Sequence, residues 1–133
     1  MLYYLKLYFA TLAVFFAVDM FWLGVVSRTF YRKHLGFLMA PEVIWYAALV
    51  FYFLFIAGVL VFVVLPGLKE NDLTITLVKA AFFGLITYAT YDLTNLATVK
   101  DWPLVITIVD LIWGMVLTTF VSLAGFFIGK WMH

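Results

Sequence analysis

The chain contains no cysteine, which excludes disulfides, thiolate metal sites and thiol nucleophiles. Charged residues are also scarce, at 11% of 133 residues, and the formal net charge is only +1. This composition leaves too little polar surface for a soluble globule and gives no basic patch for a nucleic-acid partner. With 68% hydrophobic residues and a mean hydropathy of +1.15, the sequence predicts an integral membrane protein in contact with the lipid bilayer.

Four runs are apolar enough for a spanning helix, which needs about 20 residues. They cover roughly residues 3–26, 43–65, 74–99 and 104–128. Each run is continuous rather than alternating, which indicates helices and not the strands of a barrel. The first run is longer than the apolar core of a signal peptide and has no small-x-small cleavage site after it. We therefore expect it to remain as a helix of the mature protein. We predict an all-α fold, one domain over residues 1–133 that forms a four-transmembrane-helix bundle.

Four passes place both termini on the same side of the membrane, here named side A, together with a polar turn at residues 66–72. Side B carries a longer linker, residues 27–42, which we expect to lie in the interface, and a short turn at residues 100–103. Lysine and arginine normally indicate the cytoplasmic side, but each side has four of them, so the orientation stays open. Side A has Lys6, Lys69, Lys79 and Lys130, and side B has Arg28, Arg32, Lys33 and Lys100.

Three aspartates, Asp19, Asp92 and Asp110, lie inside the apolar runs. A carboxylate in hydrocarbon costs several kcal/mol unless it is paired, protonated or hydrated, so such residues usually mark a functional site. Counting along each helix from its side-B end, at about 1.5 Å per residue, places all three about 10 Å below that interface. The sequence therefore predicts one buried acidic cluster near side B.

Two of these aspartates are followed by tryptophan three residues later, giving Asp19-x-x-Trp22 and Asp110-x-x-Trp113. This spacing puts both side chains on one helix face, where the indole N–H could donate to a carboxylate oxygen. The alternative is a chance recurrence in an aromatic-rich chain. An inverted repeat is not indicated, because only one helix matches one helix.

The run 74–99 has the densest polar content, and its helical period places several polar groups on one face. Asn95 follows Asp92 by three residues and is expected to bind the same carboxyl group or a ligand. The alternative is a polar seam that joins helices through hydrogen bonds. The face comprises Gly84, Tyr88, Tyr91 or Asp92, and Asn95.

No lysine or arginine lies at the depth of the aspartates, since Arg28 is about 13 Å along the axis from Asp19. Charge balance must come from protonation, a shared proton, a bound cation or a hydrated cavity, and each makes the site sensitive to protons or ions. Arg28 and Arg32 are candidates for gripping lipid phosphate or gating the cavity, and His34 for relaying protons. The alternatives are a snorkelling belt of basic residues and a solvated histidine.

The whole chain resembles the small bacterial membrane proteins grouped as domain-of-unknown-function family 2177. The resemblance implies a multi-pass protein of the bacterial inner membrane, and it supplies no activity. It rests on Asp19-x-x-Trp22-Leu23-Gly24, Phe30-Tyr31-Arg32, Leu35-Gly36, the run from Tyr88 to Thr98, Trp102-Pro103 and Asp110-x-x-Trp113-Gly114.

Three functional classes follow from the acidic cluster. The first binds or translocates protons, cations or a cation-coupled small solute, with a homo-oligomer completing the path through a contact at Gly125-x-x-x-Gly129. The second is an accessory protein that holds a lipid or an apolar small molecule in the same pocket. The third, an intramembrane enzyme, is least favoured.

An aspartyl protease would need a glycine-rich turn beside its second aspartate, and here Thr107-Ile108-Val109 precedes Asp110. A zinc or iron site would need a deep histidine, which is missing, although magnesium, calcium or sodium could still bind carboxylates. The sequence therefore names no catalytic residue and no cofactor.

Overall fold

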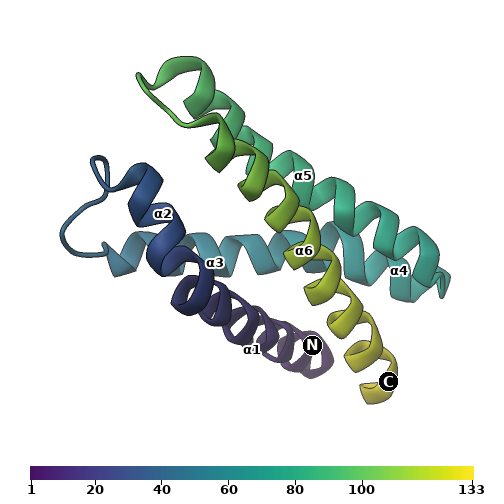
Figure 1. The fold of residues 1–133 in the computed structure, drawn as a ribbon. Coiled ribbons are helices and arrows are strands. Elements are labelled where there is room, and N and C mark those ends of the chain that lie inside the picture. Colours follow the sequence, from purple (N-terminus) through teal and green to yellow (C-terminus); the bar gives the residue numbers. More distant parts are fainter.

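The computed structural model describes residues 1–133, and all of its regular structure is helical (Figure 1). Four helical segments are long and apolar enough to cross a membrane, which confirms the predicted all-α fold with four candidate spans. The first comprises α1 (Leu2–Phe21), a π-helical turn η1 (Trp22–Val26) and α2 (Ser27–Leu35). The second comprises α3 (Trp45–Val59), the π-helical turn η2 (Leu60–Val64) and α4 (Leu65–Glu70), and the others are α5 (Leu73–Thr98) and α6 (Leu104–Met132).

The first segment does not end near residue 26 as predicted but stays helical to Leu35, so most of the expected linker is helix. The reason is that η1 widens the helix by one residue without breaking it. Figure 1 shows α2 leaving the direction of α1 after this turn. Only residues 36–44 remain as a connection to α3.

The second segment also continues past residue 65, into the stretch 66–72 that we predicted to be a polar turn. Pro66 is the second residue of α4 and comes directly after the π-helical turn η2, and the chain stays helical through it. The helix ends instead at Asn71, whose φ of 52° places it in the left-handed region. The next helix starts at once, because the Asp72 carboxylate accepts a hydrogen bond of 3.1 Å from the Ile75 N–H and caps α5.

Helices α5 and α6 form a closely packed antiparallel hairpin. Two glycines permit the approach: a Cβ on Gly84 would overlap the backbone of Gly114, and a Cβ on Gly114 would overlap the Tyr88 ring. Helix α1 packs against α6, and less extensively against α3. The apolar core contains residues from α1, α3, η2 and α6, among them Phe15, Ile56 and Leu117.

The first and last residues lie at the same end of the bundle. The Tyr3 hydroxyl donates a hydrogen bond of 2.8 Å to the carbonyl of Gly129, and the rings of Tyr3 and His133 are 5.5 Å apart. The predicted dimer contact at Gly125 and Gly129 is wrong for this fold. Both glycines are buried against the chain's own side chains, Gly125 beside Thr11 and Gly129 beside Leu68 of α4.

At the opposite end, which corresponds to side B, the bundle opens. The backbone of α3 lies farther from α5 and α6 than do η2 and α4, which continue the same segment and pack against both, although the side chain of Phe55 still reaches Phe83 of α5. Figure 1 shows α3 and the α5–α6 hairpin diverging away from α4. This divergence opens the half of the molecule that carries the three aspartates.

Candidate functional site

Asp92 is fully buried on α5, and neither of its carboxylate oxygens has a hydrogen-bond partner. Buried carboxylates are normally paired or hydrogen-bonded, because removing them from water costs several kcal/mol. The backbone around Asp92 is well satisfied by contrast. Its carbonyl accepts a hydrogen bond of 3.4 Å from the Thr107 hydroxyl, which in turn accepts one of 3.1 Å from the Trp102 indole.

The nearest partner of the Asp92 carboxyl group is the Asp110 carboxyl group across the α5–α6 interface. Asp110 is 9% exposed, and its Oδ1 accepts a hydrogen bond from the Tyr31 hydroxyl of α2. Two carboxylates this close in a low-dielectric setting cannot both carry charge without a proton or cation between them. Asp92 and Asp110 are named the acidic pair below.

Asp19 lies beside the acidic pair rather than within it. It is buried on α1, and the Tyr52 hydroxyl and the Trp113 indole lie next to its carboxyl group. No three acidic or histidine side chains are arranged to hold a metal ion together. All three predicted aspartates are thus buried in one region, where Asp19 and Asp110 line a common cavity and Asp19 has neighbours of its own.

Two cavities meet at the acidic pair. The first, of about 320 Å³, lies between α3 and α5 and is lined by Phe51, Thr87, Tyr88, Tyr91, Asp92 and Asp110. The second, of about 270 Å³, lies under η1 and α2, and Asp19, Trp22, Tyr31 and Trp113 are among its lining residues. Asp110 and Tyr88 line both cavities, so these two residues form the partition between them.

The tryptophans adopt an arrangement that spacing along one helix could not indicate. Trp22 and Trp113 stack face to face across the α1–α6 interface, with ring centroids 4.0 Å apart and planes 8° apart. Trp113 consequently lies beside Asp19 on the neighbouring helix, and Trp22 beside Tyr31. An indole therefore does lie against a carboxyl group, but the aspartate beside Trp113 is Asp19 of α1 rather than Asp110 of its own helix.

The polar face predicted for α5 is correct for some residues and wrong for others. Gly84 and Asp92 are buried and Tyr88 packs against Gly114, as that face requires. Asn95 does not bind the Asp92 carboxyl group, whose oxygens have no partner, and it lines neither cavity. Tyr91 is 59% exposed but lines the first cavity with its inner edge.

The basic residues of α2 lie outside both cavities. Arg28 and Arg32 are exposed. A ring nitrogen of His34 is 2.9 Å from the carbonyl of Phe30, one turn back on the same helix. Their proposed roles as a gate or proton relay stay predictions, and the residue of α2 that does reach the acidic pair is Tyr31.

Sequence reasoning missed four residues of this site: Tyr31, Phe51, Tyr52 and Thr87. Tyr52 carried a signal that was available, since a tyrosine deep in an otherwise apolar span needs a polar neighbour. Tyr31 had none, because its position depends on the π-turn of η1.

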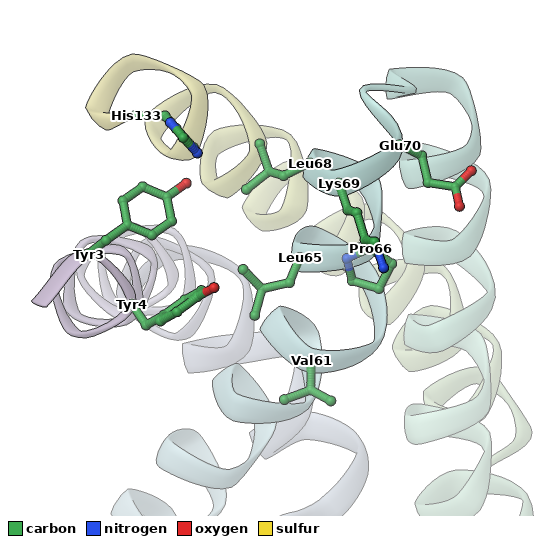
Figure 2. A pocket seen from close by; sticks show the side chains of 9 residues that line it. All are labelled: Tyr3, Tyr4, Val61, Leu65, Pro66, Leu68, Lys69, Glu70 and His133. Atoms are coloured by element: carbon green, nitrogen blue, oxygen red, sulfur yellow. The ribbon is translucent and has the colours of Figure 1, made fainter. Parts of the chain in front are cut away.

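A larger hollow of about 570 Å³ lies at the other end of the bundle, beside the termini (Figure 2). Its lining includes Tyr3, Tyr4, Lys69 and His133, and Figure 2 shows the Glu70 carboxylate pointing away from the tyrosines. None of the three membrane aspartates lines it. Its size therefore does not make it the candidate site, because the unpaired buried charge lies elsewhere.

Four apolar helices with buried carboxyl groups define a multi-pass α-helical membrane protein. The chain belongs to the family described as Predicted membrane protein (DUF2177), whose model matches residues 4–127. Neither the search of curated proteins nor that of solved structures found a match. The family fixes the class of protein, and its description assigns no reaction or ligand.

Proposed function

We propose that this protein binds protons and cations at the acidic pair and exchanges them, so that it moves a proton, a cation or a cation-coupled small solute across the membrane. The observation that carries the proposal is Asp92, which is fully buried and has two unpartnered carboxylate oxygens. A carboxyl group that is buried inside a membrane protein without a hydrogen-bond partner is a candidate functional residue for that reason alone.

The neighbours of the acidic pair favour a site that exchanges protons and cations over a site with a purely structural role. Asp110 is already held by the Tyr31 hydroxyl, whereas no donor from the rest of the chain reaches the oxygens of Asp92. The empty pair is neutralised in part by one shared proton, and an incoming cation replaces that proton. Binding a cation and releasing a proton are thereby coupled at one place.

The two cavities supply access from different directions. One lies between α3 and α5, and the other under α2, with Asp110 and Tyr88 between them. A site reached from two sides by alternate opening is the arrangement a carrier needs. A purely accessory protein would need the cavity but not the unpartnered carboxylate, and for that reason we place exchange first. The bacterial inner membrane stays the expected location.

Flux measurements on the purified protein in proteoliposomes test the proposal. With a pH gradient imposed and sodium or potassium on one side, we expect the wild type to dissipate the gradient faster than empty vesicles. Asp92→Asn should abolish this, because an amide cannot exchange a proton at the site. A wild type no faster than empty vesicles under every cation gradient would contradict the proposal.

Asp101→Asn is the matched control. Asp101 is an exposed aspartate in the turn between α5 and α6, and its φ of 61° is one that asparagine tolerates well. The same chemical change there should leave flux unaltered. If both variants lose flux equally, the effect is not specific to the acidic pair.

A further inference from the structure

We propose that the cavity between α3 and α5 binds a small organic ammonium, a protonated primary or secondary amine attached to an apolar body. This inference rests on the proposed function and names the class of cation that the acidic pair accepts. It follows from what the six lining residues offer to a ligand.

At one end the cavity offers the carboxyl oxygens of Asp92 and Asp110 as hydrogen-bond acceptors. Both oxygens of Asp92 are unpartnered. The hydroxyl of Thr87 is engaged by its own helix, at 2.9 Å from the carbonyl of Phe83 and 3.2 Å from that of Gly84, so its hydrogen is not available to a carboxylate. A ligand with a positive charge and several N–H groups complements this end, because charge-assisted hydrogen bonds are the strong ones.

The rest of the cavity is aromatic. Phe51 of α3 and Tyr88 and Tyr91 of α5 form its walls. Aromatic faces attract a cation within about 6 Å and also accept apolar groups, so they suit an ammonium whose carbon body extends away from the carboxylates. A bare sodium ion would use the carboxylates and leave this aromatic surface unused.

Size and position restrict the ligand further. A volume of about 320 Å³ is at the small end of ligand pockets, which span roughly 300–1,000 Å³, so one ring or a short chain fits. The mouth is bordered by Phe51, 46% exposed, and Tyr91, 59% exposed, on helix faces that would meet lipid. An amphiphilic amine concentrates in the bilayer and can enter there from the side.

Calorimetric titration of the full chain in lipid nanodiscs tests the inference, with phenethylammonium as the probe. Three analogues of similar shape isolate each requirement: propylbenzene lacks the charge, 3-phenylpropanoate reverses it, and phenethyltrimethylammonium keeps it without N–H donors. We expect saturable binding of phenethylammonium above the signal of empty nanodiscs, weaker binding of the quaternary compound, and none of the other two. Equal binding of propylbenzene would overturn the inference.

Variants then locate the site. Asp92→Asn should weaken phenethylammonium binding by at least about tenfold, the loss of a charge-assisted hydrogen bond, while Asp101→Asn binds like the wild type. Tyr91→Leu and Phe51→Leu leave both carboxylates in place, so they still test the location of the site if Asp92→Asn does not fold. They should weaken ammonium binding, because each removes part of the aromatic wall of the cavity. Binding that Asp92→Asn, Tyr91→Leu and Phe51→Leu all retain would contradict this location.

The two proposals fail in different ways. If proton flux depends on Asp92 but phenethylammonium neither binds nor competes with sodium, the ligand class is wrong and the cation site stands. If the probe binds and depends on Asp92 but no gradient is dissipated, the ligand class stands and the protein is a receptor rather than a carrier.

Discussion

At the scale of single residues, the unusual feature is a carboxyl group that the fold buries without compensation. Asp19 has Tyr52 and Trp113 beside it and Asp110 has Tyr31, whereas the oxygens of Asp92 have no donor. Proteins that keep such a group usually do so for function, at a cost in stability. The sequence showed which aspartates to examine, but only the packing distinguishes the unpartnered one.

Replacing this carboxyl group should therefore stabilise the protein. In Asp92→Asn, the side-chain amide is neutral and can donate to Asp110, so we expect the free energy of unfolding to rise by about 1–3 kcal/mol, the usual cost of an unsatisfied buried group. SDS-induced unfolding in mixed micelles measures this. Asp101→Asn should stay within about 0.5 kcal/mol of the wild type. A loss of stability in Asp92→Asn would show that the carboxylate has a structural partner.

At the scale of elements, the packing of α5 against α6 depends on glycines that bring two backbones together. A Cβ on Gly114 would overlap the near end of the Tyr88 side chain, which cannot swing away without moving α5. The same contact holds Tyr88 between the two cavities. The geometry of the site is thus set by the spacing of this hairpin.

Gly114→Ala tests that dependence against Gly24→Ala. We expect Gly114→Ala to lower the free energy of unfolding by about 1–3 kcal/mol, the cost of overpacking, and to weaken cation binding by displacing Tyr88. Gly24 has no atom within 4 Å of the position a Cβ would take, so alanine there should be neutral or gain up to about 1 kcal/mol from helix propensity. Thermal unfolding in nanodiscs compares the two. Equal effects would contradict the assigned contact.

The π-turn η1 is the second element on which the site depends. Deleting Thr29, which follows this turn in the regular helix α2, should rotate the rest of α2 by about 100°, the angle of one residue, and carry Tyr31 away from Asp110. A benzophenone amino acid at position 31 should photocrosslink to α6 in the intact chain and lose this product after the deletion. Deleting Ala40, in the loop before α3, is the control. Crosslinking that survives the loss of Thr29 would show that the register of α2 after η1 does not position Tyr31.

At the scale of the whole molecule, hydropathy and length were enough to predict the class of fold and its four helices. The burial of Asp19, Asp92 and Asp110 was also predictable, since charge in an apolar run has few other places to go. The features that the sequence did not predict depend on packing between residues far apart in the chain. The Trp22–Trp113 stack, the contact of Tyr31 with Asp110, and the internal burial of Gly125 each follow from how helices cross, which periodicity along one helix does not contain.

The central claim, that the acidic pair holds an exchangeable proton, is tested most directly by the infrared difference spectrum between wild type and Asp92→Asn in lipid at neutral pH. Asp101→Asn serves as the reference. We predict a carbonyl stretch of a protonated carboxyl group that is present in the wild type and in Asp101→Asn, missing in Asp92→Asn, and diminished when phenethylammonium is added. A wild-type spectrum in which every carboxyl group is ionised without added cation, or a band that Asp92→Asn leaves unchanged, would contradict the account.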